Sequence, residues 1–174
     1  MSAPQPPIFY RRLKLHYEVA NDCGPVVTLT SPENVADFCT ALTRDPQEVM
    51  LWIGLDSRKH VIAVQEVFRG TVDSCSVHPR DVFRSALVLA STVAGVILVH
   101  NHPSGCCDPS DEDLEFFDTV TEAGELLKIP VIDCLVIARD GAWSRAEDGR
   151  IKRPEGYNKE LIEPATIASS GWSE

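Results

Sequence analysis

The chain has 174 residues, of which 44% are hydrophobic and 24% are charged, and its formal net charge is −10 at pH 7. These values are typical of one globular domain with a sizeable core. The acidic balance argues against tight, non-specific binding of nucleic acid, which needs a basic surface. No apolar run approaches the ~20 residues of a membrane helix, so we expect no membrane association.

The first half of the chain predicts a helix, a hairpin and a second helix. Ser31 is typical of an N-cap residue before a helix over 32–42, with proline at its first position. Two runs rich in β-forming residues, 49–55 and 61–68, flank a turn-like segment and predict a β-hairpin. A proline begins the next helix, 79–94, which has one apolar face and ends at a glycine.

The second half predicts a buried strand, a long helix and two further strands. Residues 96–99 form a continuous apolar run, as expected of a strand that is buried on both faces. Apolar residues recur at helical spacing over 110–127. Strands are expected at 131–138 and 142–144, on either side of an Asp-Gly turn. This order predicts an α/β domain with a mixed central sheet flanked by helices.

Three segments follow from these patterns. Residues 1–30 are expected to be an N-terminal extension, in which 8–19 could form an edge strand or lie over the core. Residues 31–149 are the predicted domain. Residues 150–174 are polar and contain prolines, and they are expected to form a C-terminal tail.

Cysteine usage indicates the compartment. The six cysteines are irregularly spaced, and none forms a Cys-x-x-Cys pair. The first seven residues lack the apolar segment of a signal peptide. A reduced, cytoplasmic setting is therefore expected.

The most informative motif follows the buried strand. Side chains alternate along a strand, so His100 and His102 are expected to point the same way. Asp113, in the first turn of the next helix, offers a third ligand atom. Two imidazoles and one carboxylate, with a fourth position left for water, are typical of a catalytic zinc site. The pattern predicts Zn²⁺ bound by these three residues.

A second interpretation needs no metal. Ser110 and Asp113 have the spacing of a capping box, in which each side chain accepts a hydrogen bond from the other residue's backbone. This explains the serine and the aspartate but leaves the two histidines without a role. The sequence alone leaves both interpretations open.

The segment from His100 to Gly105, together with Ser110 and Asp113, resembles the JAMM (MPN+) zinc motif, in the form found in RadC proteins. Further RadC-like blocks occur in the same order at 66–71, 77–83 and 122–131. The resemblance covers roughly residues 31–146 and implies a single MPN/JAB domain of cytidine-deaminase-like fold. Full-length relatives often carry a helix-hairpin-helix module before this domain, and we expect this chain to lack it.

The resemblance also implies chemical roles. Glu66 corresponds to the general base, although the residue by itself would be taken for a solvent-facing strand glutamate. Ser110 corresponds to the serine that steadies the oxyanion, and the start of the helix there adds a favourable dipole.

The chain departs from the RadC pattern at three cysteines. Cys106 and Cys107 replace an Asp-Pro pair, and Cys134 stands where relatives tend to have histidine. A thiol near the metal could compete as a ligand or be oxidised. The alternative is a loop that has changed without chemical consequence.

Three functions compete at this stage. The complete ligand set favours a zinc metallopeptidase or isopeptidase that cuts an amide or isopeptide bond, with a protein, a peptide or a ubiquitin-like conjugate as substrate. The RadC resemblance also raises a role on or near DNA, which the net charge disfavours. A non-catalytic interaction module is disfavoured by the intact ligands. A zinc deaminase is excluded because its Pro-Cys-x-x-Cys motif is absent.

Overall fold

A computed structural model describes residues 25–70, 77–89 and 92–151. The expected strand at 8–19 and most of the expected tail lie outside these ranges. The described elements follow in chain order: α1 (Pro32–Phe38), the 3₁₀ helix η1 (Thr40–Arg44), β1 (Glu48–Leu55), β2 (Val61–Gly70), α2 (Pro79–Val88), β3 (Gly95–Asn101), α3 (Asp111–Leu127), β4 (Val131–Ala138), β5 (Gly141–Ser144) and β6 (Gly149–Ile151).

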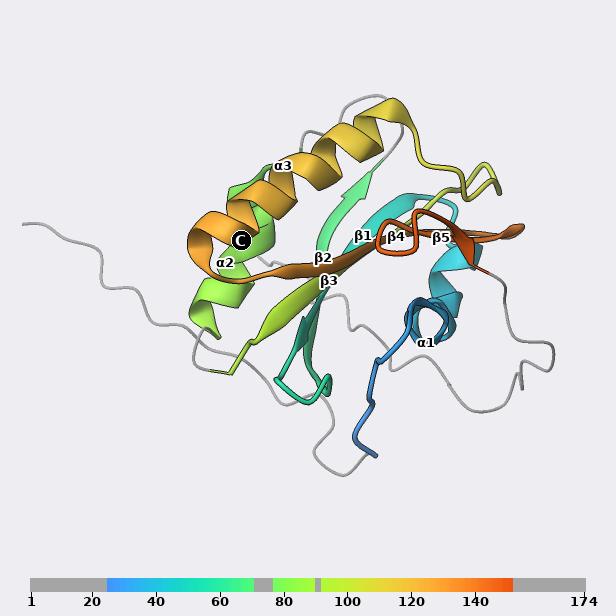
Figure 1. Ribbon diagram of the computed structural model, residues 1–174. Helices are drawn as coiled ribbons and strands as arrows, with labels where there is room; N and C mark the ends of the chain where they lie inside the picture. Colours follow the sequence, from blue (N-terminus) through green and yellow to red (C-terminus); the bar gives the residue numbers. More distant parts are fainter. Residues whose placement is uncertain (1–24, 71–76, 90–91, 152–174) are drawn as a thin grey trace, which may run out of the picture.

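The strands form one six-stranded sheet with the order β2-β1-β3-β4-β5-β6. β3 and β4 run parallel, and the other neighbouring strands of this sheet run antiparallel. α2 and α3 lie on one side of the sheet, and α1 lies on the other (Figure 1). The predicted α/β domain with a mixed sheet and flanking helices is confirmed.

Each face of the sheet has its own hydrophobic core. The core on the α1 side includes Leu51 and Val99. The core on the α2–α3 side includes Trp52, Leu98 and Phe117. All seven residues of β3 are buried, as the continuous apolar run predicted for a central strand.

The structure corrects the expected elements at three places. The first helix ends at Phe38, and a 3₁₀ turn replaces the rest of 32–42. The second helix ends at Val88 rather than near residue 94. The expected tail begins inside the sheet, because β6 pairs with β5 through Ile151. A three-residue strand is too short to show a periodic pattern in the sequence.

One irregularity in the hairpin decides which side chains reach the site. Met50 lies opposite Phe68 and Leu51 lies opposite Glu66, so Val67 is an extra residue in β2. Such a bulge interrupts the alternation of the strand. Directly opposed residues share a face of the sheet. Glu66 therefore shares the face of Leu51, not that of Met50.

A glycine lets α3 pack closely against α2 and against the loop that leads into β4. A Cβ atom on Gly124 would lie 2.6 Å from the carbonyl oxygen of Ile129 and 3.1 Å from the ring of Phe83. Only a residue without a side chain avoids this overlap. Within the described residues, no helix combines the length and apolar character needed to cross a bilayer.

Candidate metal centre

His100, His102 and Asp113 converge at the end of β3 and the start of α3. The Nε2 atoms of the two histidines are 3.1 Å apart. The Asp113 oxygens lie 3.2 Å from Nε2 of His100 and 3.3 Å from Nε2 of His102. Ligand atoms around a tetrahedral ion with bonds of about 2.0–2.1 Å are separated by about 3.3–3.4 Å. The three side chains are therefore close enough together to share a metal ion.

The surroundings of each histidine hold its ring in place. His100 is 1% exposed and packs against Phe117, with ring centroids 5.7 Å apart. His102 directs Nδ1 at the carbonyl oxygen of Cys106, at 3.0 Å. A carbonyl can only accept, so Nδ1 carries the proton and Nε2 of His102 keeps a free lone pair. A hydrogen bond of this kind is the usual outer support of a metal-binding histidine.

The loop between His102 and α3 is tied to the far edge of the sheet. Gly105 has φ of 95°, a backbone conformation that other residues rarely adopt. Arg150 of β6 donates two hydrogen bonds of 2.7 Å to the carboxylate of Asp108 and one of 3.1 Å to Asp140. The strand that the sequence analysis had placed in the tail thus anchors the loop that follows the histidines.

Ser110 and Asp113 form the predicted capping box at the start of α3. The Ser110 hydroxyl oxygen accepts from the Asp113 backbone N–H at 3.1 Å, and the Ser110 N–H donates to Asp113 Oδ2 at 2.8 Å. The Ser110 hydroxyl also donates to Oδ2, at 2.7 Å. The same carboxylate faces both histidines. The two interpretations of this pair are therefore compatible, since the cap also orients the metal-ligand candidate.

Electrostatic coupling is strong within the cluster. Burial alone would raise the pKa of Asp113, but hydrogen bonds with His100 and His102 outweigh it and hold that pKa far below its usual range. The pKa of His102 is raised, chiefly by its hydrogen bond with Asp113 and further by the charges of Asp113 and Glu48. Metal-free protein therefore holds an ionised carboxylate beside an imidazole that gains a proton easily.

A pocket of about 560 Å³ opens beside the cluster. Its lining combines acidic side chains, His102 and Ser110 with apolar side chains. The lining residues are Glu48, Met50, Phe68, Val77, His102, Pro103, Ser104, Ser110, Glu112, Asp113 and Phe116. This set contains three carboxylates and no lysine or arginine.

Glu48 is a pocket residue to which the sequence analysis assigned no role. It begins β1 and is two residues from Met50, which lies directly opposite His100 in β3. Alternation therefore places Glu48 on the face of the sheet that carries the two histidines. The available signal was the alternation of Glu48, Met50 and Trp52, but it could not show which strand lies beside the metal ligands.

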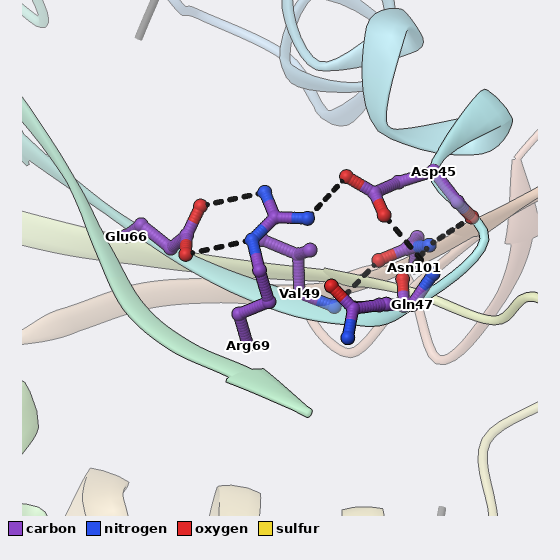
Figure 2. Close-up of polar contacts among 6 residues, drawn as sticks. All are labelled: Asp45, Gln47, Val49, Glu66, Arg69 and Asn101. Carbon is purple, nitrogen blue, oxygen red and sulfur yellow. Dashed lines mark hydrogen bonds and ion pairs between the residues drawn. The ribbon is translucent and has the colours of Figure 1, made fainter. Parts of the chain in front are cut away.

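Glu66, the base predicted from the resemblance, is not among the residues that line the pocket. Both of its carboxylate oxygens accept hydrogen bonds from Arg69, at 2.8 and 2.9 Å (Figure 2). Arg69 also donates to the carboxylate of Asp45, at 2.6 Å. The bulge at Val67 turns Glu66 to the face of the sheet opposite the histidines. The structure thus brings together four of the predicted site residues, and Glu66 lies apart from them. The four are His100, His102, Ser110 and Asp113.

The family model for the RadC-like JAB domain matches residues 29–150. The chain belongs to this family. UPF0758 proteins of Thioalkalivibrio sulfidiphilus and Cupriavidus pinatubonensis are 46% identical over 122 residues and 42% identical over 126 residues. These matches cover 70% and 71% of this chain, and 53% and 54% of the relatives. A UPF0758 protein of Thermotoga maritima is 37% identical over 123 residues, which are 71% of this chain and 54% of that protein.

The chain thus spans about half the length of these curated relatives. The names of these relatives state no activity. Family membership supports the domain type, and the three-donor cluster is compatible with a metal site.

The three cysteines that distinguish this chain from the RadC pattern lie outside the three-donor cluster. Burial raises the pKa of Cys107 to about 11, so this thiol stays protonated at neutral pH. Cys134 is fully buried in the core beneath α3, and burial likewise raises its pKa. Cys106 is exposed, and its contribution to the site is the backbone carbonyl that accepts from His102.

The pKa shifts predict opposite effects of pH on the metal-free and metal-bound protein. The raised pKa of His102 stabilises the metal-free fold fully below about pH 6.5, and this contribution is lost as pH rises through the folded-state value. The lowered pKa of Asp113 stabilises it above about pH 3.9. We expect the melting temperature of metal-free protein to fall from about pH 6 to about pH 8, while the stabilisation by added zinc grows because protons compete for His102.

Melting curves with zinc and with a chelator, recorded across this pH range, test the expectation. A zinc-induced stabilisation that shrinks as pH rises would contradict it.

Proposed function

We propose that this RadC-like JAB domain is a zinc-dependent hydrolase of amide or isopeptide bonds. The observation that carries the proposal is the position of Glu48, which lines the same pocket as His102, Ser110 and Asp113. A three-ligand metal site beside a free carboxylate is the arrangement that metal-assisted hydrolysis requires. The raised pKa of His102, to which the charge of Glu48 contributes, supports their electrostatic coupling.

The proposed roles follow from the side chains present. His100, His102 and Asp113 would hold the zinc ion. When bound, zinc acts as a Lewis acid and lowers the pKa of a water molecule to about 7. Glu48, in place of Glu66, takes a proton from the attacking water and returns it to the leaving amine. The mechanism thus needs one carboxylate that is not a ligand, which Glu48 supplies.

Ser110 is proposed to stabilise negative charge on the carbonyl oxygen during attack. Its hydroxyl now donates to Asp113, so this role requires the hydroxyl to rotate towards the substrate. Three acidic residues lie in the first turn of α3, and their negative charges reduce the positive potential that the helix dipole produces there. Orientation of Asp113 is the role of Ser110 that the hydrogen bonds support most directly.

The pocket also bears on the class of substrate. Met50, Phe68, Val77 and Phe116 offer an apolar wall to a peptide side chain. Phosphates need basic partners, and the lining contains no lysine or arginine. We therefore propose a protein or peptide substrate, with a ubiquitin-like conjugate as one form, in preference to DNA. The free thiols of Cys39, Cys106, Cys107 and Cys134 suit a reducing, cytoplasmic location.

A parallel cleavage assay tests the proposal. Zinc-loaded protein is incubated with ubiquitin-like fusions, with isopeptide-linked conjugates, with a peptide library, and with labelled single- and double-stranded DNA. We expect cleavage in the protein or peptide group that a chelator abolishes and added zinc restores. Metal-dependent cutting of DNA alone, or no cleavage in any group, would overturn the proposal.

A further inference from the structure

Asn101 stands between the two histidines but points the other way. Strand alternation sends His100 and His102 to the pocket face, so the Asn101 side chain emerges on the α1 side of the sheet. It is 1% exposed, although its amide can form several hydrogen bonds. A buried polar side chain at this position must find partners there.

The partners are the residues that lead into β1. Oδ1 of Asn101 accepts from the backbone N–H of Val49 at 2.8 Å. Nδ2 donates to the carbonyl oxygen of Gln47 at 3.0 Å and to that of Asp45 at 3.4 Å (Figure 2). Val49 and Gln47 are the immediate neighbours of Glu48. One side chain therefore holds the backbone on both sides of the proposed base.

These bonds begin where the strand pairing stops. The pairing of β1 with β3 runs from Leu55 opposite Gly95 to Met50 opposite His100, where it ends. Beyond Met50, the Asn101 side chain supplies the hydrogen bonds that a neighbouring strand would otherwise provide. Without them, the first residues of β1 would keep only their pairing with β2, from Glu48 opposite Gly70 onward.

Arg69 adds a second, more exposed attachment. It bridges the carboxylates of Glu66 and Asp45, and its side chain is 39% exposed. Ion pairs of this exposure contribute little to stability. The buried amide of Asn101 is therefore the stronger restraint on this connection.

We propose that Asn101 is a positioning residue that fixes Glu48 relative to the metal ligands. The tripeptide His100–His102 then carries two functions on opposite faces of one strand. The histidines supply metal ligands, and the asparagine holds the backbone that presents the base. This inference rests on the proposed function, but its geometric part can be measured without turnover.

Two substitutions distinguish the acceptor bond of the Asn101 amide from its donor bonds. Asn101→Leu is close in size and removes the donor and the acceptor. Asn101→Asp keeps the acceptor for Val49 and replaces the donor with an oxygen that faces two carbonyl groups. Ser144→Ala is the matched control, because Ser144 is also a buried polar residue and its hydroxyl donates to Asp133 at 2.7 Å on the same face of the sheet.

The first readout needs no substrate. Co²⁺ is added to metal-free protein, and pseudocontact shifts of the backbone amides report their positions relative to the ion. In Asn101→Leu we expect altered shifts at Gln47, Glu48 and Val49, unchanged shifts along α3, and amide exchange at Val49 at least ~100-fold faster. In Asn101→Asp we expect the Val49 amide to exchange as slowly as in wild type, and the pseudocontact shift of Gln47 to change. If Asn101→Leu does not fold, this variant alone tests the inference.

The second readout is turnover. We expect Asn101→Leu to lower kcat by at least ~10-fold while KM and zinc affinity change little, because ligands and pocket walls are retained. Ser144→Ala is expected to lower the melting temperature without changing kcat or the Glu48 shift. Unchanged pseudocontact shifts at Glu48, or an unchanged kcat in Asn101→Leu beside an active wild type, overturn the inference. An inactive wild type overturns the proposed function alone, and the cobalt measurement still decides the role of Asn101.

Discussion

Glu48→Gln is expected to lower kcat by about 10²- to 10⁴-fold, the usual contribution of a general base. Glutamine retains the size of the side chain but cannot take a proton from water. Zinc content is expected to stay at about one ion per chain, because Glu48 is not among the three proposed ligands. The measurement is kcat on the best substrate from the cleavage assay, together with metal analysis of the same sample.

The matched control is Glu66→Gln, which makes the same chemical change on the opposite face of the sheet. Glu66 is bound to Arg69 and does not line the pocket. We expect kcat within about threefold of wild type and a loss of stability below about 1 kcal/mol, as for other exposed ion pairs. A large loss of kcat in Glu66→Gln with little loss in Glu48→Gln would restore Glu66 as the base.

Asp113→Asn is expected to weaken zinc binding by at least ~100-fold, since even outer-shell substitutions cost 10- to 100-fold. The amide removes the negative charge that faces both histidines but keeps an oxygen for the N–H of Ser110. Zinc at about 100 times its dissociation constant stabilises a protein by about 2.7 kcal/mol. The variant should lose most of this stabilisation and all chelator-sensitive turnover.

Asp111→Asn provides the control, because Asp111 lies in the same helical turn, is exposed and lies outside the three-donor cluster. Zinc titration by calorimetry and melting curves with and without zinc compare the two variants. Equal zinc affinity in wild type and Asp113→Asn would remove Asp113 from the ligand set.

The three-donor cluster of His100, His102 and Asp113 could be predicted from the sequence because it depends on local rules. His100 and His102 are two residues apart on a strand, so they share a face whatever the neighbouring strands do. Ser110 and Asp113 are three residues apart at a helix start, so they share a turn. The continuous apolar run before His100 predicted the central position of β3. Each inference required only a short segment of the chain.

Glu48 required information that no short segment contains. Its place in the pocket depends on β1 lying beside β3 with Met50 opposite His100, which is a tertiary register. Glu66 has the sequence context of the RadC pattern, which by itself favours Glu66 as the base. The single extra residue at Val67 then reversed its face. A bulge is decided by packing across the hairpin, so it leaves little trace in hydrophobic periodicity.

The sequence by itself determined the α/β class, the order of the main elements and the three metal-ligand candidates, because periodicity, capping and turn chemistry act over a few residues. Only the tertiary structure decided that Glu48 lines the pocket and Glu66 does not, which backbone groups Asn101 holds, and that Arg150 in β6 anchors the loop after the histidines. The hydrogen bonds of Asn101, and those from Arg150 to Asp108, join residues that are 42 to 56 positions apart. Their formation depends on strand register and on a bulge, which the folded sheet sets as a whole.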